Sequence, residues 1–296
     1  MSRDRAESLL RDRYLSVTTV PDPELLEGAR RGDARALETL LERHAPAVYR
    51  FGLKMCGNPH DAQDVVQETL LAAARSLQDF RGDASFTTWL YTVARNACSR
   101  RARSSKFAPA ALEPLRDDDS LPSHELAPDE ALERSTLART LDEALASLSA
   151  SEREILVLRD IEGLSASETS EVLGLSVAAV KSRLHRARAA LRERLEPHFP
   201  AGERLGATQA GASCPEIVSV FSQYLEGEIG PAQCEAMQAH VAGCKRCDAA
   251  CNSLRRSVAL CNTAPVEPVP PEVQARIKEA LRGLLPSGPA ADAPRR

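Results

Sequence analysis

Two cysteines and a histidine near the C-terminal end of the chain are spaced as metal ligands. They form the pattern His240-x3-Cys244-x2-Cys247. Two thiolates two residues apart can chelate one ion, and an imidazole one helical turn earlier faces the same way. A fourth ligand completes a tetrahedral Cys3His shell, which suits zinc, and Cys214 lies upstream. The alternative is that these cysteines are inert, small apolar residues.

The segment around this pattern resembles the zinc-binding anti-sigma domain. In that domain the first cysteine precedes a helix similar to PEIVSVFSQYLEGEI at 215–229. The resemblance implies one Zn²⁺ per chain, held by Cys214, His240, Cys244 and Cys247. Three further cysteines, on apolar stripes, are expected to be buried, with a second site for a thiophilic metal or a redox switch as the alternative: Cys234, Cys251 and Cys261. Cys56 and Cys98 are assigned to the core.

Aromatic and basic side chains are concentrated between residues 80 and 103, FRGDASFTTWLYTVARNACSRRAR. Phe80, Phe86, Tyr91 and the only tryptophan, Trp89, lie within twelve residues of a chain that is only 4% aromatic. Ring faces stack on unpaired bases at roughly 1–3 kcal/mol each, while cations follow the phosphates. The pattern therefore suits single-stranded nucleic acid, and the alternative is the core of a small helical domain.

This block resembles the promoter-melting segment, regions 2.3 and 2.4, of the extracytoplasmic-function (ECF) sigma factors of bacterial RNA polymerase. In that family a Phe ahead of an Arg-Gly-Asp loop and an Asn near the end of the next helix line a pocket for a base flipped from the minus-10 element. Phe80 and Asn96 match these positions. The resemblance implies minus-10 contacts from Phe80, Trp89, Arg95, Asn96, Arg100 and Arg101.

The helix expected ahead of this block has one apolar face and one mixed face. Its apolar stripe has helical spacing, and consists of Ala62, Val65, Val66, Thr69, Ala73 and Leu77. The mixed face alone would be read as solvated surface. However, DVVQETLLAA at 64–73 resembles the region 2.2 helix that docks on the clamp helices of the polymerase β′ subunit. That resemblance implies core-polymerase binding by Asp64, Gln67 and Glu68.

A helix-turn-helix is predicted between residues 149 and 195. Ser149/Glu152 and Ser165/Glu168 are capping-box pairs, Gly174 ends the second helix, and a basic helix follows. The segment resembles sigma region 4, which reads the minus-35 element. Thr169-Ser170 and Ala178-Ala179 depart from the Ile-Ala and Gly-Thr common in that family, which puts the promoter sequence in doubt. The implied minus-35 residues are Val177, Lys181, Ser182, Arg183, His185, Arg186 and Arg188.

The net charge of −4 conceals a strong segregation of charge along the chain. Residues 181–194 carry six basic residues and one acid, whereas residues 113–133 carry eight acids and one arginine. The electrostatic field that a nucleic acid experiences depends on this local distribution of charges and not on the net charge. No apolar run has the length of a membrane span, and the N-terminus lacks a signal-peptide core, so we expect a cytoplasmic protein without membrane contact.

The expected fold class is all-α, because β-branched alternation is scarce and helical spacing recurs. Helix breaks are expected near Gly32 and Pro46, and Val273, Ile277, Leu281 and Leu284 share one face of a C-terminal helix. The expected parts are a mobile N-terminal arm (1–22), sigma region 2 (23–103), an acidic Pro/Ser linker (104–136), sigma region 4 (137–195), a linker (196–211), a zinc-binding domain (212–261) and a Pro-rich segment with a short amphipathic helix (262–296).

These features predict an ECF-type sigma factor that is not an enzyme. Its expected partners are core RNA polymerase, through the β′ clamp helices and the β flap, and promoter DNA, with an anti-sigma factor or a metal signal as input. The zinc-binding domain is expected to inhibit the chain in cis in response to metal or redox state. The alternatives are a positive scaffold role for that domain, a conventional helix-turn-helix regulator with a structural zinc domain, and a metal-trafficking or thiol-buffering protein.

Overall fold

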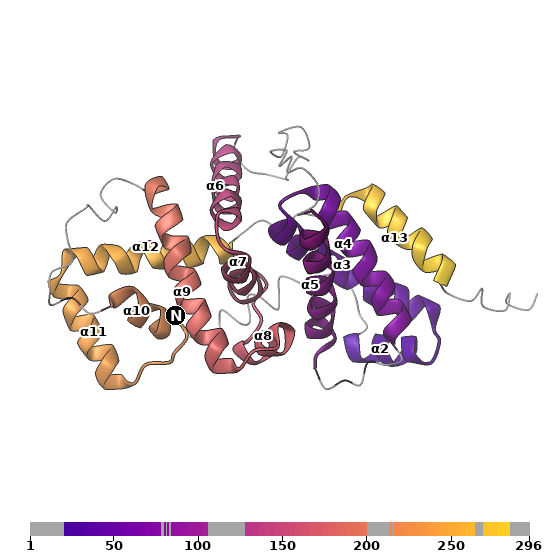
Figure 1. Ribbon diagram of the computed structural model, residues 1–296, viewed down its shortest axis with the longest axis horizontal. Helices are drawn as coiled ribbons and strands as arrows, with labels where there is room; N and C mark the ends of the chain where they lie inside the picture. Colours follow the sequence, from indigo (N-terminus) through magenta and orange to yellow (C-terminus); the bar gives the residue numbers. More distant parts are fainter. Residues whose placement is uncertain are drawn as a thin grey trace, which may run out of the picture. The chain divides into compact units, whose positions relative to one another are not determined.

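The computed structural model describes residues 21–77, 80, 82, 84–105, 128–199, 214, 216–263 and 269–284. Every regular element within these ranges is a helix, so the predicted all-α fold class is confirmed (Figure 1). The helices form two compact units. Unit 1 contains α2, α3 as far as Gly52, α4, α5 and α13, and unit 2 contains α6 to α12 together with the last residues of α3. Most of the predicted arm at 1–22 and much of both predicted linkers lie outside the described residues.

Unit 1 is built from α2 (Asp22–Arg30), α3 (Ala34–Cys56), α4 (Pro59–Ser76), α5 (Phe86–Ser105) and α13 (Pro271–Leu284). Helix α4 packs on both α5 and α13. At Gly52 a Cβ atom would lie 3.2 Å from the Ala62 Cα atom, so the crossing of α3 and α4 needs a residue without a side chain. The large, fully buried side chains of this unit are Leu40, Leu41, Phe51, Leu70 and Leu90.

The predicted break at Gly32 is confirmed, and the break near Pro46 is wrong. Gly32 has φ of 91°, the left-handed conformation that favours glycine, and it separates α2 from α3. Helix α3 instead continues through Pro46. An internal proline costs a helix about 3 kcal/mol. The apolar face on both sides of Pro46 is buried, from Leu40 to Phe51, and this burial offsets that cost.

Unit 2 combines a helix-turn-helix with three helices of a cysteine-rich domain. Its elements are α6 (Pro128–Ala146), α7 (Ala150–Leu156), a π-helical turn η2 (Val157–Ile161), α8 (Ala166–Leu173), α9 (Val177–Leu195), a 3-10 turn η3 (Glu196–His198), α10 (Ile217–Leu225), α11 (Pro231–Gly243) and α12 (Lys245–Asn262). Helix α6 thus begins inside the predicted linker at 104–136. Helices α10 and α12 both pack on α9.

Both predicted capping boxes are confirmed. The Ser149 and Ser165 hydroxyls each accept a hydrogen bond from the backbone N–H three residues on, and Glu152 and Glu168 each accept one from the N-cap backbone. Gly174 ends α8 in the left-handed conformation, with φ of 64°. Ser176 then caps α9 by accepting a hydrogen bond from Ala179 N–H. Local hydrogen bonding therefore fixes both ends of the turn.

No helix in the described part of the chain is long and apolar enough to cross a membrane.

The Ser165 cap should contribute measurably to the stability of unit 2. Ser165→Ala leaves the Glu168 N–H in the first turn of α8 without its partner, so we expect a loss of about 1 kcal/mol in the free energy of unfolding. Urea denaturation followed by circular dichroism measures it. Ser167→Ala is the matched control, because Ser167 is exposed in the first turn of the same helix. Equal stability of the two variants would contradict the cap.

Candidate metal centre and nucleic-acid interface

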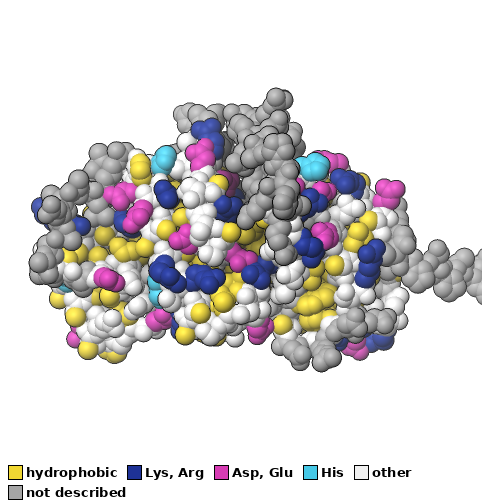
Figure 2. All heavy atoms as spheres, in the orientation of Figure 1, with side chains coloured by type: hydrophobic (Ala, Val, Ile, Leu, Met, Phe, Trp, Pro, Cys, Tyr) yellow, Lys and Arg dark blue, Asp and Glu magenta, His cyan; other side chains and the backbone are white. Residues whose placement is uncertain are grey.

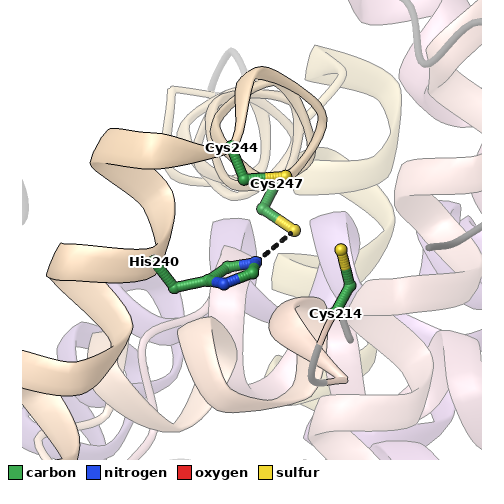
Figure 3. Close-up of side chains that lie close together, drawn as sticks. All are labelled: Cys214, His240, Cys244 and Cys247. Atoms are coloured by element: carbon green, nitrogen blue, oxygen red, sulfur yellow. Dashed lines mark hydrogen bonds between the residues drawn. The ribbon is translucent and has the colours of Figure 1, made fainter. Parts of the chain in front are cut away.

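The four residues predicted as metal ligands come together in unit 2. Cys214 precedes α10, His240 lies near the end of α11, Cys244 precedes α12, and Cys247 lies in the first turn of α12. One ligand atom from each lies within 4.8 Å of all the others. In Figure 3 the four side chains converge, with His240 Nε2 3.1 Å from Cys247 Sγ.

Three sulfurs and one imidazole nitrogen fit a zinc ion. Tetrahedral ligands at ordinary Zn–S and Zn–N lengths stand about 3.3–3.8 Å apart, so atoms already within 4.8 Å need only small movements. The cluster also explains the loop between α11 and α12. Only two residues separate Cys244 from Cys247, and Cys244 is the N-cap of α12, so both thiols are presented at the start of one helix.

The thiols at this centre differ in acidity. Hydrogen bonds from the backbone and side chain of Cys247 hold the pKa of Cys244 below its ordinary value. Burial and the neighbouring thiols raise the pKa of Cys247 to about 12. Metal ligation requires both as thiolates, so a bound dication must supply the charge that favours deprotonation of Cys247.

The other cysteines separate into buried and half-buried residues. Cys98, Cys251 and Cys261 are buried, as predicted, whereas Cys56 and Cys234 are half-buried instead. Burial raises the pKa of Cys251 to about 11 and that of Cys261 further. Within the described residues, none of these five belongs to a group of close metal ligands.

Helix α9 carries the predicted minus-35 residues on two different sides. Val177, Ser182 and Arg186 are exposed, and Lys181 and Arg183 are half-buried. A cavity of about 830 Å³ lies between this side of α9 and the cysteine-rich domain, and is lined by basic residues of both, including Lys181, Arg186 and Arg246. His185 and Arg188 are only 8% and 4% exposed, because they face α10.

Arg188 is the centre of a buried ion network. Its guanidinium donates to both carboxylate oxygens of Asp160, at 2.9 and 2.5 Å, and to Glu226 at 2.7 Å. Arg159 also pairs with Glu226. Burial opposes the charge on Arg188, but Asp160 and Glu226 outweigh it and raise its pKa. Burial likewise disfavours the Glu226 carboxylate, yet Arg188 and Arg159 hold its pKa below the ordinary value.

A second set of contacts joins α9 to Ser222 of α10 and to Glu228, which follows that helix. Ser222 hydrogen-bonds to His185 Nδ1 at 2.8 Å, and Glu228 lies 3.2 Å from His185 Nε2 and 3.1 Å from Lys181 Nζ. The cysteine-rich domain thus provides the polar partners of three predicted minus-35 residues. The sequence pattern did not indicate these pairs, because the partners lie in another domain.

In unit 1 the predicted minus-10 aromatics form one cluster. The Phe80 ring is 6% exposed and lies 5.8 Å from Phe86 and 5.2 Å from Trp89 between ring centroids. The Arg30 guanidinium lies over the Phe80 ring, 5.4 Å from its centroid. Asn96 and Arg100 are exposed, and Trp89, Arg95 and Arg101 are half-buried.

The predicted core-binding acids of α4 pair with cations of α5. Asp64 accepts from Arg101 at 2.6 Å, and Glu68 pairs with Arg100. Opposite charges therefore alternate here instead of forming separate acidic and basic areas. Lys and Arg are interspersed with Asp and Glu over the face of the molecule shown in Figure 2.

Comparisons with known proteins identify three parts of the chain. The model of sigma-70 region 2 matches residues 40–107, that of sigma-70 region 4 matches 138–191, and that of a putative zinc-finger matches 214–247. The RNA polymerase sigma-H factor of Pseudomonas aeruginosa is 33% identical over 61% of this chain and 97% of its own length. The ECF RNA polymerase sigma factor SigW of Bacillus subtilis is 30% identical over 57% of this chain and 94% of its own length.

A third relative is the ECF RNA polymerase sigma factor SigL of Mycobacterium tuberculosis, 35% identical over 58% of this chain and 95% of its own length. The chain belongs to the ECF RNA polymerase sigma factors, a family that is not a class of enzymes. The cysteine-rich domain with its Cys/His cluster is a zinc-finger type of domain, which indicates zinc binding.

The buried ion network predicts a strong effect of a single substitution. Asp160→Ala leaves the Arg188 charge with one carboxylate instead of two, so we expect about 3–5 kcal/mol of lost stability in unit 2. Urea denaturation measures the change. Glu193→Ala is the control, because Glu193 lies exposed on α9, 3.9 Å from Arg192, where ion pairs contribute about 0–1 kcal/mol. A loss below 1 kcal/mol for Asp160→Ala would contradict the network's role.

Proposed function

We propose that this chain binds core RNA polymerase and directs it to promoters, with its own cysteine-rich domain controlling that activity. The observation that carries the proposal is the presence of a region 2 unit and a region 4 helix-turn-helix in one chain of a sigma factor family. A conventional helix-turn-helix regulator needs only the second of these. The family membership and the two matched regions therefore favour a sigma factor.

The exposed side of α9 is suited to contact duplex DNA. Val177, Ser182 and Arg186 are exposed, and the first turns of a recognition helix approach base edges in the major groove. In this role Lys181, Ser182 and Arg183 read the minus-35 element, while Arg186 neutralises phosphate. Arg188 and His185 join them only when α10 withdraws, because both are buried against it.

Unit 1 supplies the promoter-melting surface in this proposal. A base leaving the duplex would stack against the edge of the Phe80–Trp89 cluster and be read by the exposed Asn96. Arg95, Arg100 and Arg101 follow the phosphates. The cation that now covers Phe80, Arg30, would have to move for a base to stack on that face of the ring.

The cysteine-rich domain would inhibit DNA binding by pairing with residues of α9. Ser222, Glu226 and Glu228 take the hydrogen bonds and charges that DNA phosphates would otherwise take from His185, Arg188 and Lys181. While Glu226 pairs with it, the Arg188 guanidinium is only 4% exposed, so a phosphate has no access to it. The contact of these residues with α9 supports inhibition in cis over a positive scaffold role.

Zinc would hold the inhibitory helix in place. His240, Cys244 and Cys247 come from α11 and the start of α12, whereas Cys214 lies three residues before α10. When bound, one Zn²⁺ ties these segments together and gives the small domain a crosslink in place of a large core. Loss of the metal, or oxidation of a ligand thiol, would free the start of α10, which carries Ser222 to the contact with α9.

Promoter-specific run-off transcription with purified core polymerase tests both the sigma function and the inhibitory role of the cysteine-rich domain. Because Glu226→Ala/Glu228→Ala removes the carboxylates from α9, we expect about tenfold more transcript than from the wild-type chain, corresponding to about 1.4 kcal/mol of weakened docking. Glu235→Ala is the control on the exposed side of α11. A lower yield from the double variant would support the scaffold role instead, and no promoter-specific transcript from any chain would contradict the sigma function.

The zinc proposal predicts a definite stoichiometry. Wild-type chain dialysed against metal-free buffer should retain about one zinc ion by atomic emission, because the four ligands form one tetrahedral shell. Cys244→Ser should retain much less, while Cys234→Ser should match the wild type, since Cys234 lies outside the cluster. Equal zinc loss in the two variants, or two ions in the wild type, would contradict a single Cys3His site.

A further inference from the structure

The cavity between α9 and the cysteine-rich domain is large enough for an organic ligand. Its volume is about 830 Å³, and its walls come from α9 on one side and from α10 and the start of α12 on the other. All three helices belong to unit 2, and both α10 and α12 pack on α9 (Figure 1). Ligand sites have volumes of about 300–1,000 Å³. The cavity therefore has room for a molecule much larger than a phosphate or sulfate ion.

Cations outnumber acids among the described residues that line this cavity. Lys181, Arg186 and Arg192 come from α9, and Arg246 comes from the first turn of α12. Glu216, at the N-cap of α10, is exposed and is the one acid in this described set. Positive charges from two domains thus line one space, where they repel each other unless an anion lies between them.

Two of these arginines keep a buried nitrogen without a hydrogen-bond partner. Arg192 is 7% exposed, and its Nε is unpaired although a terminal nitrogen donates to Glu196 at 3.0 Å. Arg246 Nη1 is also buried and has no partner within the part of the chain that the structure describes. Natural structures leave few buried N–H groups without an acceptor. These two guanidiniums therefore lack acceptors, which an anionic ligand would supply.

The rest of the wall is apolar or carries neutral hydrogen-bonding groups. The apolar part consists of Ala178, Ala189, Ile217, Val218 and Ala250. Ser182, Ser219 and Gln223 add hydroxyl and amide groups. An arginine pairs with phosphate through two parallel hydrogen bonds, whereas an apolar wall suits the flat face of a base. An inorganic anion would leave the apolar wall unused, and a neutral ligand would leave the arginines without acceptors.

We propose that this cavity binds a nucleoside phosphate, with its phosphates on Arg186, Arg192 and Arg246 and its base against the apolar wall. A phosphate monoester carries about −1.5 to −2 charge near neutral pH and has three strong acceptor oxygens, so it can pair with several cations at once. The two walls belong to different domains. A nucleotide held by both walls therefore favours the arrangement in which the cysteine-rich domain lies on α9.

The site also bears on the function proposed above. Lys181, Ser182 and Arg186 are the residues that would meet DNA there, so the nucleotide and the minus-35 element would exclude each other. The binding site itself does not depend on the sigma function, because all its residues belong to unit 2 and the ligand needs no polymerase. Binding of nucleotide to the isolated full chain can therefore fail or succeed independently of transcription.

Isothermal titration calorimetry of the full chain at fixed salt concentration tests the site with four probes: ATP, GTP, pyrophosphate and adenosine. We expect ATP or GTP to bind with a micromolar Kd, and pyrophosphate and adenosine to bind at least about tenfold more weakly, because each makes only part of the contacts. If neither nucleotide binds more tightly than about 1 mM, the proposal is wrong. Pyrophosphate binding as tight as that of ATP would assign the cavity to inorganic anions and overturn the nucleoside part.

Substitutions on the two walls locate the ligand. Arg186→Ala and Arg246→Ala should each weaken nucleotide binding at least about tenfold, because each removes a charged hydrogen-bond donor. Lys245→Ala is the matched control, since Lys245 is exposed beside Arg246 but does not line the cavity. Arg186 is exposed on α9, so its variant gives an answer even where Arg246→Ala disturbs the neighbouring Cys247. Equal weakening in all three variants would show general attraction of charge and contradict the site.

Hydrogen exchange gives a readout that does not depend on affinity. Bound nucleotide should slow the exchange of residues 217–225, because it holds α10 and α9 together. The same nucleotide should leave that exchange unchanged in the Arg186→Ala chain at equal concentration. Nucleotide that binds the wild-type chain without slowing exchange in α10 would lie elsewhere, and the proposed site would be wrong.

Discussion

The buried charge of Arg188 is the constraint on which unit 2 depends. A guanidinium that is 4% exposed needs carboxylates close by, and Asp160 alone would leave part of its hydrogen-bonding capacity unused. Glu226 completes the network from the cysteine-rich domain and is itself held by Arg159. One charge therefore requires η2, α9 and α10 to be together, which ties the helix-turn-helix to the domain that follows it. Removal of that domain exposes the network to water instead of breaking a purely apolar contact.

The metal centre and this network share α10. Cys214 fixes the chain just before the helix, and Ser222 and Glu226 make the contacts with α9 at its far end. Only nine residues form α10, too few for a stable isolated helix. Packing of Ile217 and Phe221 in the small core of the domain sets its position, and in the proposed function a metal ion held by Cys214 would fix its start. Oxidation of Cys214, or binding of a metal ion to it, would thus affect the contacts with α9 through the nine residues of α10.

Local signals made much of this structure predictable from the sequence. Capping boxes depend on residues three apart, and the His-x3-Cys-x2-Cys spacing is a property of one turn and one loop, so both were recognisable. Pro46 indicated a helix break that does not occur, because the cost of an internal proline is local, whereas the burial that offsets it depends on the packing of unit 1. The pairs of Arg188 with Asp160 and Glu226 span 28 and 38 residues, and a basic helix looks the same whether its cations meet water, DNA or carboxylates. The contact of Arg276 with Gln67 spans 209 residues and has no local signature at all.

The contact of the cysteine-rich domain with α9 and the contact of α13 with α4 depend on different kinds of interaction. The contact with α9 is buried and charged, and the thiol cluster lies at the other end of α10, so a metal or an oxidant at that cluster would act on the contact directly in the proposed function. The contact with α4 is apolar at its centre, with exposed ion pairs at its edge, and no cysteine or histidine of the described part of α13 takes part in it. A metal or redox signal therefore has no direct access to α13.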